Sequence, residues 1–286
     1  MVSSLTQQPR LTLDIFVHFL PKMTDLLLPT KHKLHGKVAI VTGGASGFGE
    51  VTALHFINHG ARAVVIADVQ DEKGQKVAAS ICPDRCTYIH CDVTDEDQVK
   101  SLVETTVSLY GQLDIMFSNA GIATPSKQVV TDLDMSAFDK VFAVNVRGMA
   151  ACVKHSARAM KKGGVRGSII CTASVMASMA NPTGGTDYVM SKHAVLGLMR
   201  AASLQLASYG IRVNSVSPGL VATPMMCESF GAEKEVAMKM TEKFSRLEGV
   251  NTEKHVADAV SFLASDESEF VTGHDLVVDG AFVFPQ

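Results

Sequence analysis

A tyrosine and a lysine four residues apart offer the clearest chemistry in the chain. Tyr188 and Lys192 lie in Tyr188-Val-Met-Ser-Lys192, within a stretch of helical pattern. Residues at i and i+4 share one helix face, so the two side chains can meet. A phenol has a pKa of about 10 and is a poor base at neutral pH. A nearby ammonium would lower that pKa into the range of a general base. On a surface helix the same pair would have no function, so other motifs are needed to interpret it.

Two further polar residues stand where they could join this pair. Ser174 closes the apolar run Ile169-Ile-Cys-Thr-Ala-Ser174, and the carboxyl ends of parallel strands face the ligand crevice. Asn145 lies in the middle of a helical stretch, where Asn costs about 0.5 kcal/mol relative to Ala. It could kink the helix or hold a water. Taken alone, a satisfied helix residue explains Asn145 equally well.

A glycine-rich turn earlier in the chain suggests a cofactor on which these residues could act. Val38 to Thr42 form an apolar β-branched run, and glycines follow at Gly43, Gly47 and Gly49 before a helical pattern begins. Without side chains in the way, backbone N–H groups and a helix N-terminus can meet a pyrophosphate. The turn therefore predicts a dinucleotide site.

An acid at the end of the next apolar run strengthens this prediction. Asp68 follows Ala63-Val-Val-Ile-Ala67. It lies about 20 to 25 residues past the turn, where a carboxylate can accept bonds from the adenosine ribose hydroxyls. An ordinary strand-end acid beside an ordinary turn is the alternative.

Later strand ends add candidates for the same crevice. Asp92 and Val93 could cover an adenine, although Asp92 also suits the start of the following helix. Small residues in Asn119-Ala120-Gly121 permit close approach of a ligand. The turn Pro218-Gly219 leads past Val221 to Thr223, which could bond a carboxamide.

The region after this turn contains the residues expected to line an apolar substrate pocket. Methionine adapts its shape to bulky apolar ligands, although such residues more often fill a core. The candidates are Met225, Met226, Phe230, Met238, Met240 and Phe244.

Strand-like and helical stretches alternate from Leu34 onward. Strands are expected at 37–42, 63–67, 86–91, 113–117, 167–172, 211–216 and 275–278, and helices near 47–59, 71–81, 95–110, 134–161, 186–209 and 253–264. This alternation predicts an α/β fold with one doubly wound parallel sheet covered on both faces. We expect a single domain over residues 34–286, preceded by an N-terminal appendage, residues 1–33, that is poorly ordered or loosely docked.

Composition narrows the classes of function. The 286 residues carry a net charge of −3 and no basic patch, so we expect no nucleic-acid partner. Residues 1–33 are too often interrupted by charges for a membrane helix; we expect a cytoplasmic protein, with organelle import through this segment as the alternative. The six cysteines suggest free thiols rather than disulfides, and no second cysteine knuckle supports a metal site.

Taken together, these motifs resemble the classical short-chain dehydrogenase/reductase family. The resemblance runs from about Leu34 to Gly280 and rests on Thr42-Gly-x3-Gly-x-Gly49, Asn119-Ala-Gly121, Asn145, Ser174, Tyr188-x3-Lys192 and Pro218-Gly219. It implies a Rossmann-like domain that forms a homotetramer or homodimer. One departure is Phe48, which stands where the family has a small aliphatic residue.

The resemblance also implies roles for individual residues. Tyr188 would be the general acid/base, Lys192 would bind the nicotinamide ribose and lower the Tyr188 pKa, Ser174 would hold the substrate oxygen, and Asn145 would anchor a relay water. Asp68 implies NAD rather than NADP, because a 2′-phosphate would meet its carboxylate. The implied cofactor-binding residues are Gly43, Ser46, Gly47, Phe48, Gly49, Asp68, Asp92, Val93, Asn119, Ala120, Gly121, Tyr188, Lys192, Pro218, Gly219, Val221 and Thr223.

Other stretches resemble a plant branch of this family. Ile170-Cys-Thr-Ala-Ser174 and Tyr209-Gly-Ile-Arg-Val-Asn-Ser-Val-Ser-Pro218 resemble secoisolariciresinol dehydrogenase. Thr186-Asp-Tyr-Val-Met-Ser-Lys192 is similar to the isopiperitenol, borneol and nepetalactol dehydrogenases of monoterpenoid metabolism. This implies NAD-dependent oxidation of a secondary alcohol or lactol on an apolar plant metabolite. The alternatives are a cyclase or binding protein that keeps NAD as a structural group, and NADPH-dependent reduction of a ketone.

Overall fold

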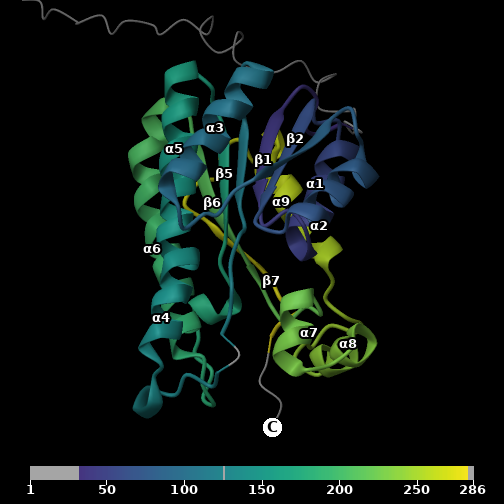
Figure 1. The fold of residues 1–286 in the computed structure, drawn as a ribbon, viewed down its shortest axis with the longest axis vertical. Coiled ribbons are helices and arrows are strands. Elements are labelled where there is room, and N and C mark those ends of the chain that lie inside the picture. Colours follow the sequence, from purple (N-terminus) through teal and green to yellow (C-terminus); the bar gives the residue numbers. More distant parts are fainter. Residues whose placement is uncertain (1–31, 125, 283–286) are drawn as a thin grey trace, which may run out of the picture. The chain divides into compact units, whose positions relative to one another are not determined.

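The computed structural model describes residues 32–124 and 126–282, which form a parallel sheet between two layers of helices (Figure 1). The strands are β1 (Val38–Thr42), β2 (Ala63–Asp68), β3 (Cys86–His90), β4 (Ile115–Ser118), β5 (Ser168–Thr172), β6 (Arg212–Pro218) and β7 (Asp275–Val278). The helices are α1 (Gly47–Asn58), α2 (Asp71–Ile81), α3 (Glu96–Tyr110), α4 (Met135–Phe142), α5 (Met149–Gly163), α6 (Thr186–Leu206), α7 (Pro224–Phe230), α8 (Lys234–Glu242) and α9 (Glu253–Ala264). The predicted doubly wound α/β fold is confirmed.

The strand order places a ligand crevice between β1 and β4. The sheet runs β3-β2-β1-β4-β5-β6-β7, and each neighbouring pair is parallel. The chain therefore builds outward from β1 in one direction and then from β4 in the other. In open parallel sheets, ligands bind at the carboxyl ends of the strands where this reversal occurs.

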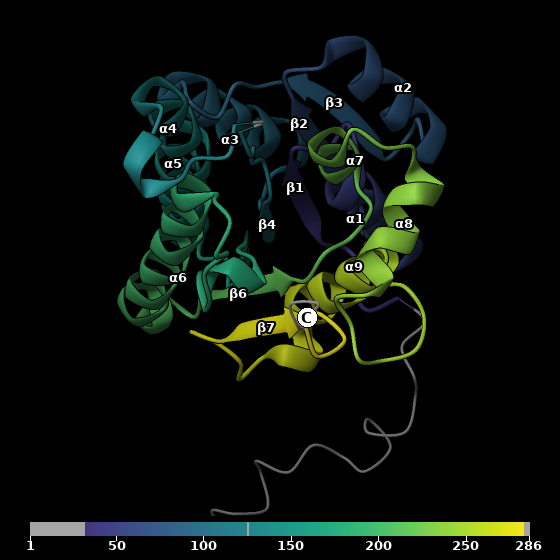
Figure 2. The same cartoon turned by 90° about the horizontal axis from the view of Figure 1, so that it is seen from below.

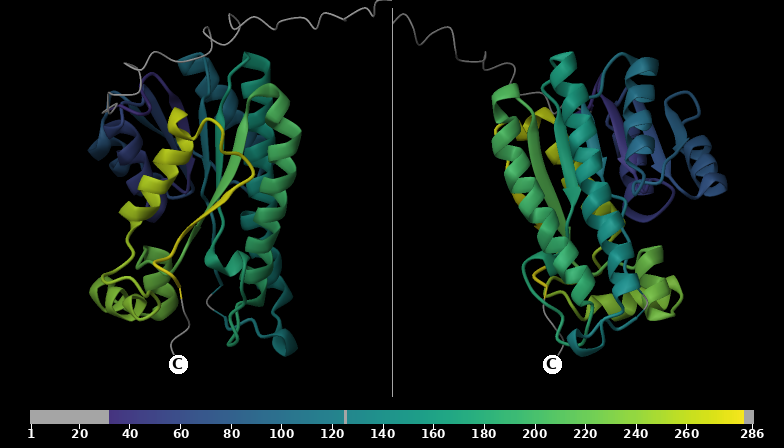
Figure 3. Two further views of the ribbon diagram at one scale, coloured as in Figure 1. Left: turned by 180° about the vertical axis from the view of Figure 1, so that it is seen from behind. Right: turned by 60° about the vertical axis from the view of Figure 1, so that its left-hand side comes forward.

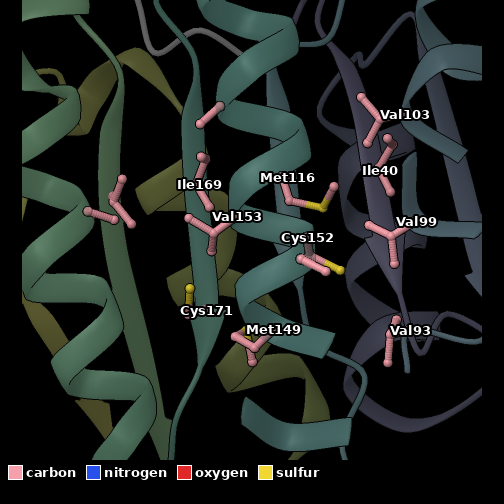
Figure 4. Close-up of a cluster of buried hydrophobic side chains, with 14 of the residues drawn as sticks. Ile40, Val93, Val99, Val103, Met116, Met149, Cys152, Val153, Ile169 and Cys171 are labelled. Atoms are coloured by element: carbon pink, nitrogen blue, oxygen red, sulfur yellow. The ribbon is translucent and has the colours of Figure 1, made fainter. Parts of the chain in front are cut away.

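Alternate residues of the strands build two hydrophobic cores, one on each face. Ile40, Met116 and Ile169 pack against residues of α3, α5 and α6, in the cluster drawn in Figure 4. Val41 and Phe117, one position further along their strands, pack with residues of α1 and α9 on the other face. Figures 2 and 3 show the two helix layers on either side of the sheet. Burial on both faces explains why the strands read as continuous apolar runs.

The helix expected over 134–161 is interrupted at its middle. α4 and α5 are joined by a π-helical turn, Ala143–Gly148, which contains Asn145. π-helical turns inside helices are frequent at functional sites. The distortion that Asn145 suggested is therefore present.

The segment between β6 and α9 holds two helices that periodicity did not predict. Pro224 occupies the first turn of α7, after Thr223 as its N-cap, and α8 follows after a short connection. A proline suits the first helical position because the N–H it lacks has no partner there. Figures 1 and 3 show α7 and α8 together beyond one end of the sheet.

Most of the expected N-terminal appendage, residues 1–31, lies outside the described residues, so this expectation stays a prediction. The described part begins just before β1, where Leu34 is buried and Lys33 forms an ion pair with Glu267 at 2.8 Å. Within residues 32–124 and 126–282, no helix is long and apolar enough to cross a membrane. No cluster of three or more potential metal ligands occurs in these ranges either.

Candidate active site

One large pocket opens at the carboxyl edge of the sheet, with a volume of about 970 Å³. Its lining contains nearly every residue that the sequence predicted for the site. Among them are Gly43, Ser46, Gly47, Phe48, Asp68, Asp92, Val93, Asn119, Ala120, Gly121, Ser174, Tyr188, Lys192, Pro218, Gly219, Val221 and Thr223. Of the predicted catalytic and cofactor-binding residues, two do not line it, Gly49 and Asn145, and both contact residues that do.

The glycine turn after β1 has the backbone that close approach of a ligand requires. Gly43 and Gly47 adopt φ values of 64° and 56°, a region that favours glycine. A Cβ at Gly49 would lie 2.1 Å from the Gly43 carbonyl oxygen, so Gly49 lets α1 pack tightly against the turn. Phe48 is half-buried, lines the pocket and packs against the core on the α1 face. The turn therefore accommodates the unusual ring, which contacts the core.

We expect Gly49→Ala to disable this turn and Gly197→Ala to be harmless. Gly197 lies within α6 with open space around its Cβ position, so alanine there should stabilise the helix by roughly 0.5–1 kcal/mol. At Gly49 the added methyl must displace backbone, so dinucleotide affinity should fall at least about tenfold and the melting temperature should drop. Dinucleotide titration by calorimetry and thermal unfolding of both variants check this. Equal behaviour of the two would contradict it.

Asp68 stands at the end of β2 with its carboxylate fixed by backbone donors. Oδ2 accepts the N–H of Ala45 at 3.1 Å, and Oδ1 accepts the N–H of Gln70 at 3.0 Å. The side chain thus ties β2 to the glycine turn while it lines the pocket. Its position fits an acceptor for ribose hydroxyls beside a pyrophosphate cradle.

Asp92 and Val93 lie in the pocket wall after β3. Of the two roles suggested for Asp92, adenine contact and helix N-cap, the structure excludes the N-cap. The N-cap of α3 is Asp95, whose side chain accepts the N–H groups of Asp97 and Gln98. Asp92 instead bonds Thr94, accepting its N–H at 2.9 Å and its hydroxyl at 2.8 Å. Asp92 is therefore a turn residue that faces the pocket, and its contact with an adenine stays a prediction.

Asn119 links three strands at the centre of the site. Its N–H donates to Thr42 Oγ1 at 2.9 Å, and its Nδ2 donates to the Thr42 carbonyl at 3.0 Å. Its Oδ1 accepts the Thr172 hydroxyl at 3.1 Å. The ends of β1, β4 and β5 are therefore held together by one amide, which keeps the crevice in register. The sequence motif began at Thr42, but neither Thr42 nor Thr172 was assigned this linking role.

Ser174, Tyr188 and Lys192 converge in the pocket. Ser174 hydrogen-bonds Tyr188, and Lys192 Nζ lies 5.5 Å from the centre of the Tyr188 ring. Lys192 is buried and donates to the Thr172 carbonyl at 2.9 Å. This places the end of β5 and one face of α6 around a common point, as the i and i+4 spacing predicts.

Burial displaces the pKa of both titratable groups from ordinary values. It raises the pKa of the Tyr188 phenol, and the hydrogen bond with Ser174 acts in the opposite direction. It lowers the pKa of Lys192 to about 8. The expected lowering of the Tyr188 pKa by Lys192 is not among the causes acting in this structure, so that role stays a prediction.

Asn145 lies behind the pocket and shapes it through Ile122. Its Oδ1 accepts the Ile122 N–H at 2.8 Å, while Nδ2 donates to the Ile122 carbonyl at 2.9 Å and to Ser191 Oγ at 3.1 Å. A Cβ at Gly121 would lie 3.3 Å from Asn145 Oδ1 and 3.6 Å from Lys192 Nζ. The π-helical turn thus positions the segment after β4 against α6, next to Lys192.

Asp187 is a site residue to which sequence reasoning assigned no role. It is buried, lines the pocket and accepts the Thr124 hydroxyl at 3.0 Å and the Tyr188 N–H at 2.8 Å. It therefore ties the segment after β4 to the start of α6, directly before the tyrosine. Its acidic type in the first helical turn was visible in the sequence, but its partner Thr124 is 63 positions away.

The turn after β6 brings α7 beside the glycine turn. A Cβ at Gly47 would lie 3.7 Å from both Pro224 and Thr223, and the Thr223 hydroxyl accepts the Met226 N–H at 3.4 Å. The N-termini of α1 and α7 therefore lie close to each other at the pocket, an arrangement suited to an anion such as a pyrophosphate.

The expected apolar substrate wall is only partly as predicted. Met225, Met226 and Phe244 line the pocket. Met238 and Met240 do not line it, because both lie on α8, which reaches the pocket only through the residues that follow it. The side chain of Phe230 lies outside the described part of the structure. Phe282, beyond β7, joins the wall.

Comparison with known proteins matches this fold and site to one family. The family described as "Enoyl-(Acyl carrier protein) reductase" matches residues 43–282. A short-chain type dehydrogenase/reductase from Mycobacterium marinum has a similar structure, with a TM-score of 0.81 and 33% sequence identity over 89% of this chain and 98% of that one. The chain belongs to the short-chain dehydrogenase/reductase family, a family of oxidoreductases.

Plant relatives are closer in sequence. A mitochondrial (−)-isopiperitenol/(−)-carveol dehydrogenase of Mentha piperita is 57% identical over 249 residues, covering 87% of this chain and 94% of the relative. The (+)-cis,cis-nepetalactol synthase of Nepeta racemosa is 56% identical over 251 residues, covering 87% and 93%. The expected resemblance to the monoterpenoid branch is confirmed.

Proposed function

We propose that this protein is an NAD-dependent dehydrogenase that oxidises a secondary alcohol or lactol on an apolar monoterpenoid. The observation that carries the proposal is the convergence of Ser174, Tyr188 and Lys192 in the pocket that also contains the glycine turn and Asp68. The relatives named for isopiperitenol and carveol oxidation support the substrate class.

The residues present fit a dinucleotide. Gly43 and Gly47 leave a cradle that side chains would otherwise fill, at the N-terminus of α1. Asp68 presents a fixed carboxylate to the same pocket, which favours ribose hydroxyls over a 2′-phosphate. Asn119 to Gly121 and Thr223 would complete the contacts along the crevice, and Lys192 would hold the nicotinamide ribose. When bound, NAD would accept the hydride that leaves the carbinol carbon.

The chain's own residues would handle the proton. Ser174 would hold the substrate oxygen beside Tyr188, and the phenolate of Tyr188 would accept the hydroxyl proton. Lys192, when charged, would favour the phenolate. Both side-chain polar atoms of Asn145 are hydrogen-bonded to Ile122 or Ser191, so a relay water would bind to the main chain of Asn145 instead. The apolar wall would exclude bulk water and orient the carbon skeleton.

Charge at Asp68 should set the choice between NAD and NADP. Asp68→Asn keeps the size but removes the negative charge, and it leaves the N–H of Ala45 or Gln70 facing an amide donor. We expect NAD affinity to fall about tenfold and the preference for NAD over NADP to narrow by a similar factor. Parallel titration with both dinucleotides measures this, with Asp97→Asn on the exposed face of α3 as control. An unchanged preference in Asp68→Asn would refute this role for Asp68.

The second candidate is a cyclase that retains NAD as a structural group. The nepetalactol synthase relatives favour it. Incubation with NAD and a panel of monoterpenols, lactols and lignan diols separates the two functions. NADH formation, followed at 340 nm, supports the dehydrogenase, whereas a product formed without any absorbance change supports the cyclase. Homotetramer or homodimer formation and a cytoplasmic location stay predictions.

A further inference from the structure

Two phenylalanines from distant parts of the chain form part of the pocket wall. Phe244 follows α8 and Phe282 follows β7, yet their rings stack with centroids 5.7 Å apart and an interplanar angle of 18°. Both line the pocket, and both are half-buried. Figure 3 shows the chain after β7 passing beside the α7–α8 segment. The stacked rings therefore connect the loop after α8 with the loop after β7 at the pocket wall.

Hydrogen bonds fix the two loops to each other. The Gly280 carbonyl accepts three bonds, from the N–H of Arg246 at 2.8 Å, from the N–H of Leu247 at 3.1 Å and from Ser245 Oγ at 2.9 Å. We use the name aromatic clasp for Phe244 to Leu247 together with Gly280 to Phe282. These three bonds hold the loop after α8 against the turn after β7.

The backbone of the clasp is specialised to present Phe282. Gly280 and Ala281 have φ values of 61° and 62°, so two successive residues adopt the left-handed region. For Ala281 this costs free energy, because its Cβ crowds the carbonyl. A Cβ at Gly280 would lie 2.1 Å from Ser245 Oγ, so a larger residue would displace the hydroxyl that bonds the Gly280 carbonyl. This backbone conformation precedes Phe282, whose ring stacks on Phe244.

The clasp is also anchored to the catalytic edge. Val278, just before it, accepts the N–H of Gly219 at 2.9 Å and the Nδ2 of Asn251 at 2.7 Å. Gly219 belongs to the pocket turn after β6. The position of the stacked rings is therefore set relative to the sheet edge that carries the candidate catalytic residues.

Three methionines give part of the remaining apolar wall adaptable side chains. Met176 follows β5, and Met225 and Met226 lie on α7. A thioether chain adjusts its shape to a ligand, whereas a stacked ring pair held by a hydrogen-bonded loop does not. Next to these methionines, the clasp is the part of the wall in which two rings are held by both stacking and backbone hydrogen bonds.

We propose that the aromatic clasp sets the size of the carbon skeleton that the pocket accepts, with Phe244 and Phe282 as specificity-determining residues for a single apolar ring. The inference rests on the proposed function and deepens it, because it assigns the choice of substrate to named residues. Aromatic faces bind ring hydrocarbons through apolar contact and make no demand for a second polar group.

The test compares three alcohols of increasing size, cyclohex-2-enol, carveol and a lignan diol, with NAD in the full-length protein. We expect Phe244→Ala and Phe282→Ala each to lower kcat/KM for carveol about tenfold. We expect both to raise the lignan diol to carveol ratio by roughly tenfold or more, since pocket volume decides such ratios. Gly280→Ala should shift the ratio in the same direction, because its Cβ displaces the clasp.

The matched control is Phe138→Ala. Phe138 stacks on Phe142 in α4 with centroids 4.3 Å apart, and neither ring lines the pocket. An unchanged size preference in the clasp variants, or an equal change in Phe138→Ala, would overturn the proposal. If the wild type forms no NADH with any alcohol, the dehydrogenase function fails. The clasp is then judged by calorimetric binding of the same alcohols, where the size preference must still shift in Phe244→Ala and Phe282→Ala.

Discussion

Tyr188→Phe should lose turnover by roughly 10²- to 10⁴-fold while it still binds NAD, because a positioned acid/base contributes about that much. The substitution removes only the hydroxyl that hydrogen-bonds Ser174 and keeps the ring that packs in the pocket. In the proposed function, NAD would be held mainly by the glycine turn, Asp68 and Lys192, which this variant leaves unchanged. Steady-state rates with carveol and calorimetric titration with NAD measure the two quantities separately.

The pH dependence of the wild type provides an internal check on this role. Burial raises the pKa of Tyr188, so at neutral pH little of the phenol is in the deprotonated form that accepts a proton, and this share grows as pH rises. The rate of alcohol oxidation should therefore increase with pH up to about 8, where Lys192 begins to lose the charge that favours the phenolate. The reverse reduction, which needs the protonated phenol, should show no such increase. Tyr209→Phe, whose hydroxyl bonds Lys161 on the surface, is the matched control and should keep the wild-type rate and profile. Full activity in Tyr188→Phe would exclude it as the acid/base.

Lys192→Met should remove activity and at the same time stabilise the protein measured without added nucleotide. The pKa of Lys192 is lowered by burial to about 8, whereas an unfolded lysine titrates near 10.5. At pH 7 both states are protonated, and the folded state carries the full cost of the buried charge, roughly 3 kcal/mol. Methionine has similar length and no charge. We therefore expect the free energy of unfolding at pH 7 to rise by ~1–3 kcal/mol, after the lost bond to Thr172 is deducted.

The sign of the pH effect separates this explanation from a packing effect. Between pH 8 and 10.5 the unfolded state holds a proton that the folded state has released, so wild-type stability should rise with pH in this window. Lys192→Met should lack that rise. Denaturant unfolding across this range measures it, with Lys154→Met on the exposed face of α5 as control. Lower stability of Lys192→Met at pH 7 would contradict the account.

Local patterns were sufficient for the sheet and for most of the nucleotide site. β1 and β2 are buried on both faces, so each appears as a continuous apolar run that ends at the crevice. Gly43 and Gly47 are needed for their positive φ, a requirement that residue type alone reveals. The site residues at these strand ends were predictable because parallel strands bring their carboxyl ends to one edge.

Contacts between distant segments were not predictable from patterns. Asp187 acts through Thr124 and Asn145 acts through Ile122, and neither pairing leaves a periodic signal. The stack of Phe244 on Phe282 depends on a turn at Gly280 that only the folded chain specifies. α7 was missed because its seven residues are too few for a clear helical periodicity, and a proline stands at its start.

The most direct test of the proposed function follows the hydride itself. Carveol labelled with deuterium at the carbinol carbon is incubated with the protein and NAD, and the product and the cofactor are analysed by mass spectrometry. We predict one labelled reduced cofactor for each molecule of ketone formed, and label transfer that is slowed in Tyr188→Phe by the same factor as its turnover. A product that retains its deuterium while NAD stays oxidised would contradict the dehydrogenase and support the cyclase.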